Sequence, residues 1–179
     1  SATGMAWRAA KDTKALITSI CTPVTLYEDT TYYALSGIAT KKKTGSSVSG
    51  DSFGMFELDS GIYNVCLSDG MGSGKRANDE SNLVVDLLEK FLEAGFKKSE
   101  AIDMMNSAMV LSGEGDSFST VDFAAIDLYS GVAEIIKIGA AVSFVKRNRK
   151  VEVIQCDSLP VGYDAEQKIN PVKTKLENG

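Results

Sequence analysis

No histidine occurs among the 179 residues of this chain. Histidine is the usual general base of hydrolytic enzymes, the partner of serine and cysteine nucleophiles, and the commonest metal ligand in proteins. Its absence excludes phosphohistidine chemistry and every catalytic triad that depends on an imidazole. Hydrolytic chemistry on this chain would have to use carboxylates, backbone carbonyls or bound metal ions instead.

Cysteine is scarce as well. The three cysteines, Cys21, Cys66 and Cys156, form no C-x-x-C pair, which argues against a zinc site and against a disulfide framework. A thiol phosphatase would carry arginine six residues after its cysteine, and none of the three is followed by arginine at that spacing. This cysteine usage fits a reducing, cytoplasmic compartment.

Long apolar runs are missing too. No stretch approaches the roughly 18 apolar residues of a membrane-spanning helix, and the N-terminus lacks the pattern of a signal peptide. We therefore expect no membrane contact from this segment itself. Acidic residues outnumber basic ones by 24 to 19, which gives a formal net charge of −5. This balance disfavours a nucleic-acid partner.

The amount of apolar sequence predicts one core. With 179 residues, 44% of them hydrophobic, the chain is expected to form a single domain over residues 1–179. Strands are predicted at residues 16–27, 31–39, 53–58, 62–68, 119–128, 132–138, 141–146 and 151–154, and helices at 75–94 and 99–110. The residues from 159 onward are expected to form a looser tail. This order predicts an α+β fold with a helical pair against antiparallel sheets.

One predicted hairpin brings two acidic residues together. Asp59-Ser60-Gly61 has the chemistry of a tight turn, with glycine at the left-handed position. Pairing Leu58 with Ile62 fixes the register of the two strands, and the extended ladder places Asp51 directly opposite Asp69. The sequence therefore predicts that the two carboxylates face each other at one end of the hairpin.

Two facing carboxylates need a cation. Directly opposed like charges on neighbouring strands are destabilising, and Mg²⁺ or Mn²⁺ prefers carboxylate, carbonyl and water oxygens. Phe53 and Leu67 share the strand face of Asp51 and Asp69, so this face is expected to point inward. The alternative interpretation places each aspartate in a common solvent-exposed turn that holds no metal.

The glycine-rich run at residues 70–74 resembles a nucleotide-binding loop only superficially. A phosphate-binding P-loop would need glycine where Asp69 stands and serine or threonine where Arg76 stands. The dinucleotide fingerprint would need its third glycine at Lys75. Neither nucleotide site is therefore expected. The basic segment 41–47 is interpreted as a solvated loop.

Three motifs carry a resemblance to a known family. They are V-S-G-D-S at residues 48–52, L-S-D-G-M-G-S-G at 67–74 and S-T-V-D at 119–122. Together they resemble the stage II sporulation protein E family of metal-dependent type 2C serine/threonine phosphatases, over residues 33–179. The resemblance implies an antiparallel β-sandwich flanked by helical pairs, with two Mn²⁺ or Mg²⁺ ions at one edge.

The resemblance also implies roles for individual residues. Asp69 corresponds to the carboxylate that bridges both ions, Gly70 offers its backbone carbonyl, and Asp51 is the acid on the neighbouring strand. Asp51 and Asp69 are thus the expected catalytic residues, whereas a structural role is favoured for Asp122. The family takes two further aspartates from later motifs that this sequence does not contain. We therefore expect a domain that is incomplete at its C-terminus and poorly active alone.

The implied activity is hydrolysis of phosphoserine or phosphothreonine in proteins, by attack of a metal-activated water molecule. The implied substrate and partner is a phosphorylated anti-sigma factor antagonist, whose dephosphorylation activates a sporulation sigma factor. The parent protein would be anchored in the membrane, with this domain on the cytoplasmic side. A non-catalytic, phosphatase-like interaction module is the alternative function, and a homodimer stays open as an assembly.

Overall fold

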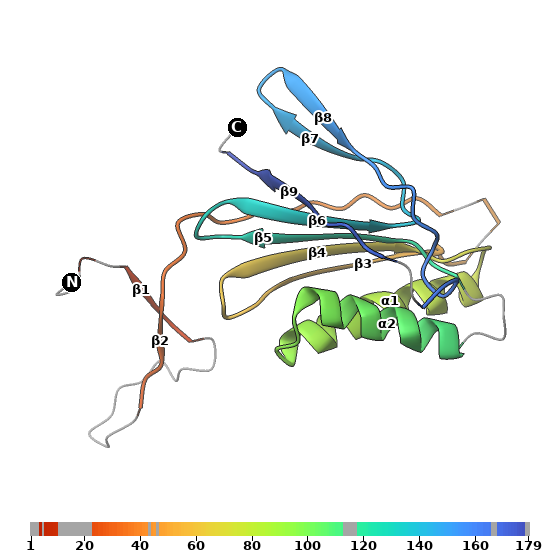
Figure 1. Ribbon diagram of the computed structural model, residues 1–179, viewed down its shortest axis with the longest axis horizontal. Helices are drawn as coiled ribbons and strands as arrows, with labels where there is room; N and C mark the ends of the chain where they lie inside the picture. The colour runs from red at the N-terminus through yellow and green to blue at the C-terminus, as the bar shows by residue number, and fades with distance from the viewer. Residues whose placement is uncertain are drawn as a thin grey trace.

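The molecule is built around one antiparallel sheet with two helices on one of its faces (Figure 1). The computed structural model describes residues 4, 6–10, 23–42, 44–45, 47–112, 118–165 and 168–177. The central strands are β3 (Asp51–Glu57), β4 (Ile62–Asp69), β5 (Val121–Asp127), β6 (Val132–Ile138) and β9 (Val172–Lys175), and they pair in the order β3-β4-β5-β6-β9. The helices are α1 (Lys75–Glu93) and α2 (Lys98–Ser112).

Two small sheets accompany the central one. β1 (Trp7–Ala9) pairs with β2 (Leu26–Glu28), and β7 (Ser143–Arg147) pairs with β8 (Lys150–Ile154). In Figure 1 the β7–β8 hairpin projects on the side of the central sheet away from the helices. The predicted α+β class, with a helical pair against antiparallel sheets, is confirmed. The expectation of a single domain over residues 1–179 stays a prediction.

The core lies between the helical pair and the central sheet. Leu88 of α1, Ile102 and Met105 of α2 and Phe123 of β5 are fully buried there. Helix α1 follows the predicted apolar stripe, and Gly95 just beyond its end has a φ of 88°, the left-handed conformation expected of a helix stop. None of the helices in the described part of the chain is long and apolar enough to cross a membrane.

The strand predicted at residues 31–39 is wrong. This segment crosses the open face of the sheet without strand structure, and Tyr33 and Leu35 are 82% and 88% exposed. Its apolar, β-branched composition satisfied the sequence pattern, but a strand also needs a neighbour for its backbone groups. Residues 16–22, the first part of another predicted strand, lie outside the described residues. The predicted loose tail contains an unexpected strand, β9.

The expectation that the aspartate face of the hairpin points inward is also wrong. Phe53 and Leu67 are 46% and 52% exposed, whereas Ser52 and Ser68, on the opposite face, are buried beneath the helices. Small residues on that face let α1 approach the sheet closely: a Cβ atom added to Gly54 would lie 2.7 Å from Cγ1 of Val85. The helices therefore cover the sheet face that carries small and polar residues. The aspartates lie on the opposite, open face.

Candidate metal centre

The predicted register of the hairpin is confirmed. Asp51 and Asp69 are paired residues at the end of the β3–β4 ladder, and the pairing runs without a bulge from Glu57 and Tyr63. Gly61 in the connecting turn has a φ of 77°, the left-handed conformation that the sequence predicted. Strand pairing therefore brings together two carboxylates that lie eighteen residues apart.

Hydrogen bonds hold both aspartates in place. The backbone N–H of Asp69 donates to Oγ1 of Thr120 at 3.0 Å, and the Asp69 carbonyl oxygen accepts hydrogen bonds from Thr120 N at 2.9 Å and Ser119 Oγ at 3.0 Å. Ser49 Oγ donates to Oδ2 of Asp51 at 3.1 Å. No role is expected for Ser49, Ser119 or Thr120 from the sequence alone, although all three lie within the motifs that carry the family resemblance.

The electrostatics of this pair favour a cation. Partial burial raises the pKa of Asp69, and the charge of Asp51 and a side-chain hydrogen bond with it raise that pKa further. The ionised pair is therefore strained by its own like charges. A hard divalent ion would relieve this repulsion, and the oxygen donors present, two carboxylates and the adjacent Gly70 carbonyl, suit Mg²⁺ or Mn²⁺. In the described residues no group of three or more acidic or cysteine side chains gathers into a fuller metal site.

This repulsion gives a testable effect on stability. We expect Asp69→Asn to stabilise the metal-free protein at pH 7 by about 0.5 kcal/mol, because the pair is well exposed to solvent and its repulsion is screened. The raised pKa of Asp69 means that the destabilising charge appears as pH rises through that pKa. The gain should therefore vanish in acid, where Asp69 is protonated. Thermal unfolding in EDTA at pH 7 and pH 3, with Asp59→Asn in the exposed turn as control, checks both points.

Gly70 lies where the strand meets the first helix. A Cβ atom added to it would lie 2.0 Å from the carbonyl oxygen of Ala77 in the first turn of α1. Gly50, which precedes Asp51, approaches the same residue: its added Cβ would lie 3.3 Å from Cβ of Ala77. The first turn of α1 therefore lies close to the ends of both strands that carry the aspartates, with its backbone at Gly70 and with the Ala77 side chain at Gly50.

Asp122 already has a cationic partner. Its Oδ2 accepts a hydrogen bond from Lys137 Nζ at 2.6 Å and another from Ser143 Oγ at 2.5 Å. The Lys137 side chain is only 2% exposed. These contacts support the structural role expected for Asp122, because they neutralise its charge within the fold and tie β5 and β6 to β7.

Removing Asp122 should therefore be costly. We expect Asp122→Ala to lower the free energy of unfolding by about 2 kcal/mol, because it leaves a buried ammonium without its carboxylate. Urea unfolding measures this loss. The double variant Asp122→Ala/Lys137→Met should recover most of it, since the unpaired buried charge is then gone. A loss that persists in the double variant would contradict the ion-pair explanation.

The two candidate ligands line a cleft of about 720 Å³ on the open face of the sheet. Phe53 and Leu67 add apolar surface to it, and segments 36–40 and 139–141 complete much of its lining. Asp122 also contributes to this lining. The cleft thus joins an acidic pair to an apolar surface, as expected of a site that binds a ligand beside a metal ion.

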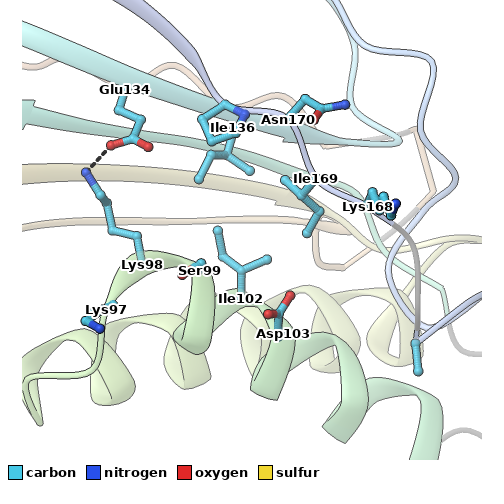
Figure 2. A pocket seen from close by; sticks show the side chains of 12 residues that line it. Lys97, Lys98, Ser99, Ile102, Asp103, Glu134, Ile136, Lys168, Ile169 and Asn170 are labelled. Atoms are coloured by element: carbon cyan, nitrogen blue, oxygen red, sulfur yellow. Dashed lines mark hydrogen bonds and ion pairs between the residues drawn. The ribbon is translucent and has the colours of Figure 1, made fainter.

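A larger cavity, of about 850 Å³, lies between α2 and β6 (Figure 2). Its acidic residues are Asp103 and Glu134, and Glu134 forms an ion pair with Lys98 across the cavity. Ile102, Ile136 and Ile169 supply apolar surface. The two acids in this cavity are not paired with each other, so the smaller cleft on the open face is the better candidate for metal chemistry.

Two curated proteins show clear sequence similarity to this chain. The chain is 40% identical to stage II sporulation protein E of Priestia megaterium over 146 residues, which cover 82% of the chain and 25% of that protein. It is 39% identical to stage II sporulation protein E of Bacillus subtilis (strain 168) over 148 residues, 83% of the chain and 18% of that protein. The chain thus spans a quarter or less of the length of these curated relatives.

A comparison with solved structures also identifies a stage II sporulation protein E domain as similar to this chain. A solved structure of the PP2C phosphatase domain and a fragment of the regulatory domain of SpoIIE from Bacillus subtilis matches with a TM-score of 0.77 and 37% identity. The match covers 86% of this chain and 46% of that one. The predicted type 2C phosphatase-like architecture is confirmed. Since the family model described as stage II sporulation protein E also matches residues 59–179, this chain belongs to the stage II sporulation protein E family.

Proposed function

We propose that this chain is the metal-binding part of a phosphoserine/phosphothreonine protein phosphatase, with Asp51 and Asp69 as its catalytic, metal-binding carboxylates. The observation that carries the proposal is the register of β3 and β4, which opposes the two aspartates at the edge of a cleft. The Gly70 carbonyl is the third proposed ligand. Two ions, Mn²⁺ or Mg²⁺, are proposed for the complete site.

The chain's own residues support hydrolysis by water. Bound metal ions lower the pKa of a water molecule and so supply a nucleophile at neutral pH without histidine. Ser49 holds the Asp51 carboxylate through its side-chain hydrogen bond, and Thr120 holds the backbone of Asp69. Burial, and to a lesser extent the charge of Asp122, raises the pKa of the Cys66 thiol to about 12, so Cys66 cannot act as a thiolate nucleophile.

The substrate, partner and location follow from family membership and are proposals for this chain. The proposed substrate is a phosphorylated anti-sigma factor antagonist, whose dephosphorylation activates a sporulation sigma factor. The parent protein is proposed to be membrane-anchored with this domain on its cytoplasmic side. A homodimer stays a prediction.

The site is proposed to be half complete within residues 1–179. Two carboxylates and a carbonyl leave a divalent ion short of its usual number of oxygen ligands. We therefore expect calorimetry to show weak Mn²⁺ binding to the chain, and Asp69→Asn to remove it. Asp59→Asn, which changes an exposed turn aspartate outside the cleft, should leave the binding unchanged. Equal binding by the wild type and Asp69→Asn would move the metal site elsewhere.

Enzymatic activity is the direct test of the proposed function. The test uses an extended form of the protein, in which the corresponding C-terminal part of the Bacillus subtilis relative is fused after residue 179. Phosphate release from a phosphoserine protein should be nearly absent with the chain alone and should appear with the extended form in the presence of Mn²⁺. An extended form that folds, binds Mn²⁺ and releases no phosphate would favour the alternative, a non-catalytic interaction module.

A further inference from the structure

Two lysines beside the cleft have no part in the proposed chemistry. Segment 36–40 lines the cleft together with the candidate ligands, and Lys41 and Lys42 follow this segment directly. Lys42 Nζ donates a hydrogen bond to the Ser47 carbonyl oxygen at 2.8 Å, which joins the two sides of the loop that leads into β3. Both lysines are exposed. The chain therefore carries two positive charges directly after a segment that lines the cleft.

These two lysines differ from the basic residues on the helix side of the site. Lys75 and Arg76 each form an ion pair with a carboxylate four residues later in α1, so their charges are balanced locally. Lys41 and Lys42, by contrast, form no ion pair with any residue that the structure describes. The Ser47 carbonyl takes one of the three ammonium donors of Lys42, which leaves two for a ligand.

The charge of the whole chain makes the position of these lysines significant. A protein with a formal net charge of −5 repels an acidic partner over most of its surface. Lysines next to the cleft that have no carboxylate partner among the described residues lower that repulsion near the candidate ligands and orient the approaching partner. A neutral partner would gain nothing from them. The arrangement therefore favours an acidic protein surface over a neutral one.

We infer that Lys41 and Lys42 form a recognition site for acidic residues that flank the phosphoserine of a protein substrate. The inference rests on the proposed phosphatase function, because it names the substrate class of the same cleft. Lys41 and Lys42 bind the flanking carboxylates through exposed ion pairs, while the phosphoserine enters the cleft beside Asp51 and Asp69. Recognition of this kind weakens as ionic strength rises.

Two labelled phosphoserine peptides test the inference by binding to the chain. One peptide carries glutamate on both sides of the phosphoserine, and the other carries glutamine at the same positions. Fluorescence anisotropy at low salt should show that the wild type binds the acidic peptide about tenfold more tightly, the combined size of two exposed charge pairs. The variant Lys41→Glu/Lys42→Glu should lose this preference.

A matched control separates recognition from net charge. Arg149→Glu/Lys150→Glu changes the net charge by the same amount at the turn and the start of β8, in the hairpin that projects away from the sheet (Figure 1). This control should keep the preference for the acidic peptide. The inference would be overturned if Lys41→Glu/Lys42→Glu kept the preference for the acidic peptide, or if the control lost it equally. The two lysines would then serve only to keep the loop solvated.

Hydrolysis is measured separately, on the extended form with p-nitrophenyl phosphate, which has no acidic flank. Its rate should stay within about twofold in Lys41→Glu/Lys42→Glu, since exposed surface charges outside the site contribute little. If the extended form shows no Mn²⁺-dependent hydrolysis at all, the proposed phosphatase function fails. A lysine-dependent preference in the binding assay would still support the recognition site in that case.

Discussion

Asp69→Asn in the extended form should lower Mn²⁺-dependent phosphate release from a phosphoserine protein by at least about 100-fold. Substitution of residues that only support a metal ligand already costs 10–100-fold in affinity or activity. Asp69 is proposed as a ligand to both ions, so its loss should reach or exceed the upper end of that range. The asparagine keeps the size and shape of the side chain, and thus removes the charge alone.

Two measurements make this result specific to the metal site. Asp59→Asn, in the turn of the same hairpin, should retain wild-type activity, because it changes an exposed aspartate that does not line the cleft. The metal-free Asp69→Asn protein should unfold at a slightly higher temperature than the wild type, for the electrostatic reason given above. Loss of activity together with gained stability cannot come from misfolding. An Asp69→Asn variant that keeps its rate would remove Asp69 from the catalytic site.

The hairpin that builds the site was predictable because its signals are local. Asp59-Ser60-Gly61 specifies a tight turn, and the two-residue period of strands then fixes every pair as far as Asp51 and Asp69. The long helix was predictable for a similar reason, since its apolar stripe and the glycine at its end, Gly95, are patterns of residues close together in the sequence. Features determined by a few adjacent residues could therefore be predicted from one sequence.

The orientation of the sheet was not predictable in this way. Alternation of apolar and polar residues shows that a strand has two different faces. It does not show which of these faces the helices cover. Here the covered face carries serines, and their hydroxyls are satisfied by hydrogen bonds from distant residues: Ser52 with Ser81 and Ser68 with Ser119, each at 2.7 Å. These partners become neighbours only when the chain is folded, so buried serines resemble surface serines in the sequence.

Strand β9 was missed for a related reason. Its sequence, Val-Lys-Thr-Lys, is short and polar, and it pairs on one side only, with β6. Edge strands commonly carry lysine, which discourages pairing with other proteins. A strand of this kind therefore looks like a solvated tail. The same limit applies to Ser119 and Thr120, whose contact with Asp69 joins residues about fifty positions apart.

Gly70→Ala should lower the free energy of unfolding by at least about 3 kcal/mol. The added Cβ would lie 2.0 Å from the carbonyl oxygen, 2.7 Å from the carbonyl carbon and 3.0 Å from the Cα of Ala77. All three are backbone atoms, so no side-chain rotation can relieve the overlap. Either the first turn of α1 or the end of β4 has to move. For a chain of this size we expect thermal unfolding about 6–12 °C lower.

Two other glycines provide a graded comparison for the same substitution. Gly54→Ala places its Cβ 2.7 Å from Cγ1 of Val85, a side-chain methyl group that can shift, so about 1 kcal/mol should be lost. Gly37→Ala meets no atom within 4 Å and has no left-handed backbone. It should leave stability unchanged or raise it by up to about 1 kcal/mol, because alanine restricts the unfolded chain.

Thermal unfolding of the three variants should therefore rank Gly70→Ala as the least stable and Gly37→Ala as the most stable. If Gly70→Ala unfolds like Gly37→Ala, α1 does not rest on the strand that carries Asp69, and the helix cannot fix the position of the proposed Gly70 ligand.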